Sequence, residues 1–419
     1  MSLREAKGQQ IVKQHANIKR AGELWLIPSQ SGRSSYKVDP KAKTCTCLDF
    51  EYRQQPCKHI FAAEFLERTQ ITTTTTTTDK RGKTTTTKTE TVKVTRQTYR
   101  QEWPAYNKAQ TNEKRLFQYL LHQLCQGIGS PSQTGAGRRF MPLEDMLFAM
   151  AFKVYSTVSG RRFMTDLKDA HGKGYLSQLP SYNVMFDYFN SEMLTPYLQM
   201  LIEESSLPLA AIEQDFAVDS SGFSSCRFVQ WTQAKYTDRQ LMEKREWVKV
   251  HLMCGVVTNV VTSVEITDRY AADTRYFKGL VEATGKNFYM QQVSADKAYL
   301  SDANLQAVSD HHAMPFIPFK SNSISTDPRN KKRHSPLWKS MYHYYSYNQE
   351  RFMQSYHKRS NVETTFHMIK SKFGDALRSK TKTAQINEAL CKVLCHNICC
   401  LIQSMFELNL KPKFWSEAA

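Results

Sequence analysis

The segment YHKRSNVETTFHMIK, residues 356–370, contains four side chains that could take part in chemistry. They are Tyr356, Arg359, Glu363 and Lys370. At about 100° per residue on an α-helix, the offsets of three, seven and fourteen residues place all four within roughly 60° of one another. A helix normally turns an apolar stripe inward and scattered charges outward. An acid flanked by two bases and an aromatic ring on one stripe instead indicates a site that holds a metal ion and a phosphate.

Two aspartates at the ends of predicted strands are candidates to join this site. Asp219 ends the strand in FAVDSSG, and Asp296 ends the strand in VSADKAY. Each of them alone is more often a turn or cap residue than a ligand. In an α/β sheet, however, strand ends beside a helix are where reactive groups converge. Magnesium prefers carboxylate oxygens, and two-metal phosphoryl transfer needs carboxylates from separate elements, so Asp219, Asp296 and Glu363 form a candidate magnesium-binding set.

A second constellation is built from sulfur and nitrogen. The stretch CTCLDFEYRQQPCKH contains Cys45, Cys47, Cys57 and His59. Three thiolates and one imidazole make a tetrahedral set suited to zinc, and four filled positions indicate a structural ion. The alternative is that four such residues lie close together by chance. We predict one zinc ion here, in a module that folds only with the metal.

Other polar residues near the predicted sheet carry weaker signals. Asp268 and Asp273 follow the third strand, where capping of the next helix explains them. Lys249 and His251 alternate on the second strand. They either face the site or lie outside it as a surface lysine and an edge histidine.

The elements that must position these residues follow from hydrophobic periodicity. Residues 112–206 carry apolar stripes of period 3.6 and predict a helical region, which is a candidate helix-turn-helix DNA reader. Three consecutive β-runs follow, and after them helix and strand alternate. The predicted strands are 216–223, 247–258, 260–267, 288–296 and 314–319, and the predicted helices between them are 272–284 and 302–311. This order is typical of an α/β fold of the RNase-H-like type.

The N-terminal and C-terminal segments differ in composition and in hydrophobic pattern. Residues 23–38 alternate around a Ser/Gly turn and predict a β-hairpin, and residues 60–70 predict a short helix. Residues 72–98 contain 15 threonines among basic residues, which predicts a flexible, positively charged linker. The apolar segment 384–408 predicts a buried helix. Its cysteines recur every four residues and are therefore interpreted as core residues; they are Cys391, Cys395 and Cys399.

Composition limits the partners and the compartment. The chain has 57 lysines and arginines against 39 aspartates and glutamates, a formal net charge of +18. Such an excess favours a polyanionic partner, most simply nucleic acid, and the alternative is a merely basic soluble protein. We expect DNA as the partner and no membrane. We find no apolar run of eighteen residues and no signal-peptide core, so we expect a cytoplasmic, nucleoid-associated protein. In such a chain the ten cysteines are more readily metal ligands or core residues than disulfides.

The opening segment resembles a known signature. Its spacing is similar to the Y-x2-R-x3-E-x6-K pattern of bacterial insertion-sequence DDE transposases, and with DSSG and ADKAY the similarity covers roughly residues 110–405. The resemblance implies an RNase-H-like core in which Asp219, Asp296 and Glu363 bind two Mg²⁺ ions, replaceable by Mn²⁺. It also implies that Arg359 and Lys370 grip phosphates near the cleaved end and that Tyr356 touches the same DNA.

The sequence departs from some relatives of this family between the second and third acids. Only 66 residues separate Asp296 from Glu363, too few for the large β domain that those relatives insert. A basic loop takes its place, and we expect Lys331, Lys332 and Arg333 to follow the DNA backbone. Trp338 could stack on an unpaired base. The alternative for Trp338 is that it anchors the next helix.

The cysteine spacing C-x-C-x9-C-x-H resembles that of SWIM zinc fingers, which are associated with DNA or protein binding. The expected organisation is therefore a zinc-binding ββα module, a linker, an all-helical region, an RNase-H-like catalytic domain and a tail. Their expected bounds are 1–70, 71–110, 111–210, 211–405 and 406–419.

The resemblance implies a transposase that cuts element ends and joins their 3′-hydroxyls to target DNA by two-metal phosphoryl transfer. Acting on two element ends implies a homodimer on DNA. Two alternatives remain open. One is a non-catalytic, zinc-dependent DNA-binding regulator descended from a transposase. The other is a nuclease or resolvase on the same fold.

Overall fold

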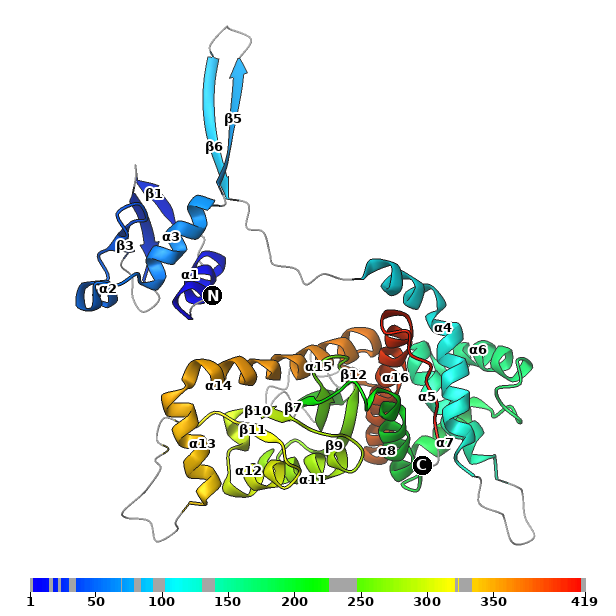
Figure 1. Ribbon diagram of the computed structural model, residues 1–419. Coiled ribbons are helices and arrows are strands. Elements are labelled where there is room, and N and C mark those ends of the chain that lie inside the picture. The colour runs from blue at the N-terminus through cyan, green and yellow to red at the C-terminus, as the bar shows by residue number, and fades with distance from the viewer. Residues whose placement is uncertain are drawn as a thin grey trace, which may run out of the picture. The chain divides into compact units, whose positions relative to one another are not determined.

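The computed structural model describes residues 3–14, 18–21, 24–29, 35–68, 70–78, 84–92, 102–129, 140–225, 247–320, 323 and 334–415. The chain divides into two compact units, Met1–Arg100 and Gln101–Ala419 (Figure 1).

The first unit is a small α/β module. Its elements are α1 (Leu3–Gln14), β1 (Lys19–Ala21), β2 (Leu24–Pro28), β3 (Ser35–Asp39), β4 (Thr44–Cys45), α2 (Leu48–Arg53) and α3 (Lys58–Arg68). The four strands form one antiparallel sheet in the order β1-β2-β3-β4. The predicted hairpin is confirmed as β2 and β3, in which Trp25 lies opposite Val38. Both side chains are buried in the core of the unit.

Helix α1 was not predicted, and it packs on α3 through a glycine. A Cβ atom on Gly8 would lie 2.8 Å from the carbonyl oxygen of Lys58 and 2.9 Å from the backbone nitrogen of Ala62. Only a residue without a side chain permits this close approach of two helix backbones. Ile11, one turn later in α1, is completely buried in the same core.

The threonine-rich segment contains two paired strands. β5 (Gln70–Thr78) and β6 (Thr84–Val92) form a two-stranded antiparallel sheet, with Gln70 opposite Val92 and Thr78 opposite Thr84. The prediction for 71–110 was a flexible linker, and the structure differs from it here. Threonine is β-branched and favours the extended backbone, which the compositional argument for a linker did not weigh.

The second unit begins with helices, as predicted. They are α4 (Trp103–Gln126), α5 (Leu143–Ser156), α6 (Gly160–Gly172), α7 (Tyr182–Phe189), α8 (Leu194–Ser206) and the 3-10 turn η1 (Leu207–Leu209). Their apolar stripes are buried; in α4, for example, Phe117, Leu121 and Leu124 share one inward face.

A mixed sheet follows the helices. Its strands are β7 (Asp215–Ser225), β8 (Trp247–Gly255), β9 (Val261–Asp268), β10 (Gln292–Ala295), β11 (Met314–Phe316) and β12 (Ala376–Leu377). The main path has the order β11-β10-β7-β8-β9. β10 and β11 run parallel to β7, and β8 runs antiparallel to β7 and β9. The predicted order of three consecutive strands and then α/β alternation is confirmed, and the structure shows that the three strands pair antiparallel.

Helices cover both faces of this sheet. They are α11 (Thr274–Gly285), η2 (Lys297–Tyr299), α12 (Asp302–Ser309), α13 (Pro336–Tyr347), α14 (Gln349–Tyr356), η3 (His357–Arg359), α15 (Ser360–Phe373) and α16 (Lys382–Glu407). Alternate residues of β7 enter different cores. Ala217 and Phe223 join the core shared with α4, α5, α8, α15 and α16, whereas Phe216 and Val218 join the core shared with α11, α13 and α14.

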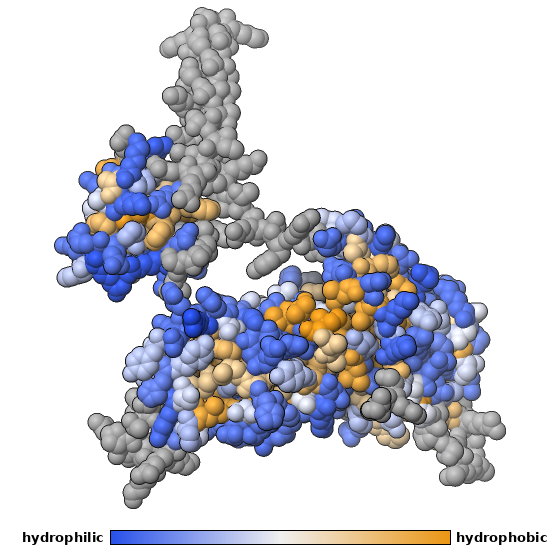
Figure 2. Space-filling model, viewed as in Figure 1, coloured by the Kyte–Doolittle hydropathy of each residue, from blue (hydrophilic) through white to orange (hydrophobic). Residues whose placement is uncertain are grey.

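The shared core changes the expected domain organisation. We expected a helical region at 111–210 and a catalytic domain at 211–405. In the structure, α4, α5 and α8 pack directly on α16, which also packs on β9 (Figure 1). On the face drawn in Figure 2, hydrophobic residues gather over the region of α15 and α16. The helices and the sheet are therefore one folding unit.

Helix α16 is the central element of that unit. It is long and apolar enough to cross a membrane, but 78% of its most apolar window is buried inside the protein. Cys391 and Cys395 are completely buried, which agrees with their interpretation as core residues. The segment after α16, predicted as a tail, docks on the helices: the Trp415 indole nitrogen donates to the carbonyl of Leu124 at 2.8 Å.

A buried asparagine on α16 ties the two layers together. Asn397 Oδ1 accepts from the backbone nitrogen of Val261 at 2.8 Å. Its Nδ2 donates to the Val261 carbonyl at 2.7 Å, to Ser205 Oγ at 3.0 Å and to the Ile202 carbonyl at 3.2 Å. One side chain thus satisfies backbone groups at the start of β9 and the end of α8.

Replacing Asn397 by alanine should lower the free energy of unfolding by about 3 kcal/mol, because several buried polar groups lose their partner. Urea unfolding followed by tryptophan fluorescence measures this loss. Asn107, exposed on α4, is the matched control, and Asn107→Ala should change stability by less than about 0.5 kcal/mol. Equal losses for the two variants would contradict the assigned role of Asn397.

Candidate catalytic and metal sites

The pairing of β7 with β10 brings the two aspartates together. Val218 lies opposite Ala295 in this parallel pair, so the next residues on the two strands are Asp219 and Asp296. Neighbouring strands are about 4.8 Å apart. The two aspartates are thus neighbours. The prediction that Asp219 ends its strand is wrong, because β7 continues to Ser225 in its pairing with β8, whereas Asp296 directly follows β10. Asp296 leaves the strand with an extended backbone and begins the turn η2.

Asp219 lies in a partly buried polar environment. Its side chain is 23% exposed, and its Oδ1 accepts from the backbone nitrogen of Ser220 at 2.8 Å. Burial raises the pKa of Asp219, and the nearby carboxylates of Asp296 and Glu363 raise it further. The hydrogen bond from Ser220 and the charge of Arg359 act in the opposite direction.

Arg359 bridges two of the three predicted carboxylates. Its guanidinium donates to Asp219 Oδ2 at 2.6 Å and to Glu363 Oε1 at 2.5 Å. The Arg359 side chain is 17% exposed, whereas that of Glu363 is 58% exposed. The structure therefore brings the carboxylates of Asp219 and Glu363 to opposite sides of one guanidinium. Carboxylates that are far apart in sequence share one counter-charge.

The predicted single helix at 356–370 is wrong in detail. Tyr356 ends α14, the 3-10 turn η3 covers 357–359, and Glu363 lies in the first turn of the separate helix α15. The turn is tied to the sheet by Lys358, whose Nζ lies 2.6 Å from Asp215 Oδ2. Arg359 ends this turn, and from there its side chain reaches Asp219 of β7. Tyr356 remains beside Arg359, and the two side chains interact.

Lys370 lies on the same face of β7 as Asp219 but two residues further along the strand. Its Nζ donates to Ser221 Oγ at 2.7 Å and lies 5.2 Å from the centre of the Phe223 ring. Burial lowers the pKa of Lys370. The structure thus places Lys370 near the carboxylates without pairing it to them.

The other predicted DNA contacts are not part of this site. Trp338 is only 7% exposed; its ring stacks on His334 with centroids 4.2 Å apart and meets Phe319 edge-on at 5.1 Å. It anchors α13 in the core, so its predicted stacking on a base is corrected to the structural alternative. The basic-loop residues Lys331, Lys332 and Arg333 lie outside the described residues.

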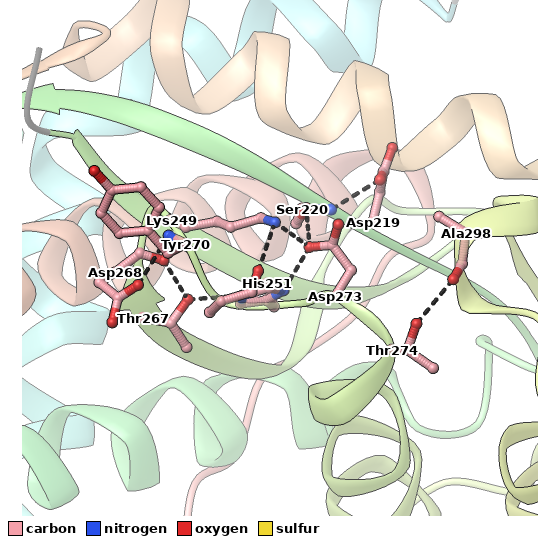
Figure 3. A network of polar contacts seen from close by, with 11 residues as sticks. Asp219, Ser220, Lys249, His251, Thr267, Asp268, Tyr270, Asp273, Thr274 and Ala298 are labelled. Carbon is pink, nitrogen blue, oxygen red and sulfur yellow. Dashed lines mark hydrogen bonds and ion pairs between the residues drawn. The ribbon is translucent and has the colours of Figure 1, made fainter.

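A polar network lies on the opposite face of β7 (Figure 3). Asp273 Oδ1 accepts from Ser220 Oγ at 2.7 Å and pairs with Lys249 Nζ at 2.5 Å. His251 Nδ1 lies 3.4 Å from the same oxygen, and His251 Nε2 contacts Thr267 Oγ1 at 2.9 Å. Asp273 makes no side-chain hydrogen bond to the start of α11, so helix capping does not explain it.

The charges of this network are set by burial and by direct contacts. Burial lowers the pKa of His251 to about 4, so the ring is neutral at neutral pH. Burial alone would raise the pKa of Asp273, but hydrogen bonds from Lys249 and Ser220 hold it below its usual range. At neutral pH the Asp273 carboxylate is therefore ionised beside a neutral His251 ring. Because Ser220 also donates its backbone nitrogen to Asp219, the network supports the strand position of that carboxylate.

The Cys₃His set is assembled in the first unit. The ligand atoms of Cys45, Cys47, Cys57 and His59 all lie within 4.8 Å of one another, and all four residues are buried. His59 Nδ1 lies 3.9 Å from Cys45 Sγ and 3.8 Å from Cys57 Sγ. A tetrahedral zinc site with ordinary bond lengths separates nitrogen and sulfur by about 3.5 Å, so the residues fit the ion.

Local structure explains how these four ligands meet. Cys45 ends β4, Cys47 precedes α2, and Cys57 and His59 begin α3. The hydrogen bond from Cys45 lowers the pKa of the Cys57 thiol, as expected where thiols crowd together. Among the described residues, this is the one group of three or more such side chains gathered tightly enough to hold a metal ion. The three predicted magnesium ligands are not gathered so tightly, since Arg359 lies between two of them.

Two known families match parts of the chain. Residues 211–398 match the family of transposase DDE domains, and this range contains Asp219, Asp296 and Glu363. Residues 36–66 match the family of SWIM zinc fingers, and this range contains all four zinc ligands. A comparison with curated proteins finds no match to the chain. The chain therefore carries a transposase DDE domain together with a SWIM zinc finger.

Proposed function

We propose that the protein is a DNA transposase that cuts the ends of its element and joins the freed 3′-hydroxyls to target DNA. The observation that carries this proposal is that Arg359 contacts both Asp219 and Glu363, while Asp296 lies beside Asp219 on the neighbouring strand, all within the range that matches DDE domains. Both steps are in-line displacements at phosphorus, for which carboxylates from separate elements position metal ions.

The sheet supports an RNase-H-like core. Numbered from β7, its main path has the order five, four, one, two, three, and only the second strand runs against the others. In this arrangement the first and fourth strands are neighbours; Asp219 lies within the first, and Asp296 directly follows the fourth. Helix α15 packs on β7, and its Glu363 shares Arg359 with Asp219.

The residues fit a hard divalent cation. Asp219, Asp296 and Glu363 offer oxygen ligands, and the exposed side chain of Glu363 leaves room for substrate and water. When bound, two Mg²⁺ ions would activate the attacking oxygen and stabilise the leaving one. The three carboxylates would hold the ions and define the line of attack.

The contacts of Arg359 with Asp219 and Glu363 suggest its role in the reaction. Its fork of N–H donors faces two carboxylates, and the same fork is suited to two oxygens of a phosphate. It cannot hold both sets of partners fully. We therefore assign it a change of partner, in which divalent cations take over the charge of Asp219 and Glu363 while Arg359 turns to the DNA backbone. Lys370, further along β7, would hold a neighbouring phosphate, and Tyr356 would contact the same strand.

The proposed partners are DNA and a second copy of the chain, since two element ends must be processed together. The zinc finger would contribute a further DNA or protein contact. The net charge of +18 supports a polyanionic partner.

Replacing Asp219 by asparagine or Glu363 by glutamine should lower the rate of Mg²⁺-dependent cleavage at least about a hundredfold, because a ligand charge is lost at the site of chemistry. The assay uses DNA that carries the repeats flanking the gene. Glu350, exposed on α14, is the control, and Glu350→Gln should cleave at the wild-type rate.

The same assay separates the alternatives. Cleavage without joined products would indicate a nuclease or resolvase, and wild-type binding without cleavage would indicate a regulator. Wild-type rates in either triad variant would remove that residue from the site.

Arg359→Ala should bind Mn²⁺ more tightly than the wild type, because the guanidinium no longer competes for Asp219 and Glu363. It should also lower the slope of log affinity for DNA against log salt by about one unit. Lys370→Ala should lower the slope similarly without changing the affinity for Mn²⁺. Arg351→Ala, on the exposed side of α14, serves as the control for both measurements. Unchanged affinity for Mn²⁺ in Arg359→Ala would show that Arg359 does not compete with the metal.

The purified protein should contain about one zinc ion per chain, and Cys57→Ala should abolish its binding, because the closed site needs all four ligands. Metal analysis by mass spectrometry measures the content. Cys125→Ala in α4 removes a buried thiol outside the site and should keep the zinc. Chelation should unfold the first unit and leave the second folded. A well-folded first unit without zinc would contradict the assignment.

A further inference from the structure

A cavity of about 520 Å³ lies in the second unit, and its lining contains none of the three carboxylates, Arg359 or Lys370. It opens where α5, α6 and α7 meet the segment that joins α15 to α16. Phenylalanine rings form much of its wall, and basic side chains share the lining. The lining includes Lys153, Phe186, Phe189, Phe373, Arg378 and Glu388. Its volume is in the range of pockets that hold small organic ligands.

Lys153 is an unusual member of this lining. It lies in the last turn of α5 and is only 8% exposed. Within the described part of the chain, its ammonium is held by no hydrogen bond or ion pair. Lys392 also lines the cavity, but its Nζ donates to the carbonyls of Gly374 and Ala376, each at 2.8 Å. Lys153 is therefore a buried cation directed to the cavity.

The acid in the cavity lining, Glu388, is occupied elsewhere. Both oxygens of Glu388 accept from the backbone nitrogen of Arg378, at 3.0 and 2.9 Å, and one also accepts from Ser379 at 2.8 Å. Four basic residues line the cavity against this one acid, namely Lys153, Arg378, Lys380 and Lys392. The lining has a positive excess that an anion would balance.

The apolar part of the cavity suits a flat ring. Phe189 is buried, whereas Phe186 is 43% exposed at the rim. Phe186 lies against Gly160, where a Cβ atom would come within 2.7 Å of the ring. The glycine at the start of α6 thus makes room for this aromatic wall. Aromatic rings bind planar ligands by offset or edge-on stacking.

We propose that this cavity binds a small organic anion of the size of a nucleoside monophosphate, with its phosphate on Lys153 and its ring against Phe186. The source is either a free nucleotide or an unpaired nucleotide at the end of a DNA strand. The second source rests on the proposed function, and the first does not. Burial and the charge of Arg378 lower the pKa of Lys153 to about 8, while the charge of Glu388 acts in the opposite direction. Because Lys153 loses its positive charge as the pH rises through that value, binding of the anion should weaken there.

The test is calorimetric titration of the full-length, zinc-loaded protein with dAMP. We expect one saturable site per chain, with inorganic phosphate binding more weakly because it lacks a ring. Lys153→Met and Phe186→Ala should each weaken dAMP at least about tenfold, the loss of one charged hydrogen bond or one stacking contact. Lys168→Met, on the exposed face of α6, should leave binding unchanged.

Folding of the variants is checked by their melting temperatures. Lys153→Met removes a buried charge and should not lower the melting temperature, and Phe186→Ala truncates a partly exposed ring. No binding of dAMP to the wild type, or equal binding to all variants, would overturn the proposal.

A second titration distinguishes the two sources. It compares a blunt duplex with the same duplex carrying one unpaired 3′ nucleotide. A preference for the overhang that Lys153→Met removes assigns the site to DNA ends. Binding of dAMP without such a preference assigns it to a free nucleotide. Failure of DNA cleavage would overturn the transposase proposal and leave the dAMP result standing.

Discussion

The hydrogen bonds that hold β7 between β8 and β10 determine the chemistry of the second unit. They place Asp219 beside Asp296, and they expose Asp219 and Ser220 on opposite faces of one strand. One face meets Arg359 and the other meets Asp273. A shift of one residue in this register would exchange the two faces and separate the acids. The polar networks above and below β7 depend on its register and also support it.

Charge balance around Arg359 links structure to function. Asp219 and Glu363 are both close to a guanidinium that could instead hold a phosphate. In the proposed mechanism, divalent cations and DNA replace these contacts together, so binding of metal and of substrate favour each other. Arg359 reaches Asp219 of β7 from the 3-10 turn between α14 and α15, where the backbone stays in the right-handed helical region.

Much of the site could be predicted because it depends on local spacing. The zinc ligands lie within one short stretch. Asp296 follows a strand and Glu363 lies on a helix, and both elements are visible in the sequence as patterns of period two and 3.6, whereas Asp219 was predicted to end its strand and lies within β7 instead. The contacts that were missed depend on tertiary structure. Asp273 looked like a helix cap, and only the packing of α11 on the sheet shows that it serves Ser220 and Lys249. Trp338 lies in a basic segment that suggested DNA, but its burial depends on Phe319 and His334. The burial of Lys153 could have been predicted, because this lysine lies in the apolar helix LEDMLFAMAFKVYS.

The central claim is that Asp219, Asp296 and Glu363 together bind catalytic metal ions. Anomalous diffraction from crystals of the protein with Mn²⁺ and a pre-cleaved DNA end tests it most directly. The account predicts manganese peaks bounded by the three carboxylates, with the Arg359 guanidinium moved from Asp219 and Glu363 to a phosphate. Carboxylates that still hold Arg359, with no manganese between them in a complex that contains DNA, would contradict it.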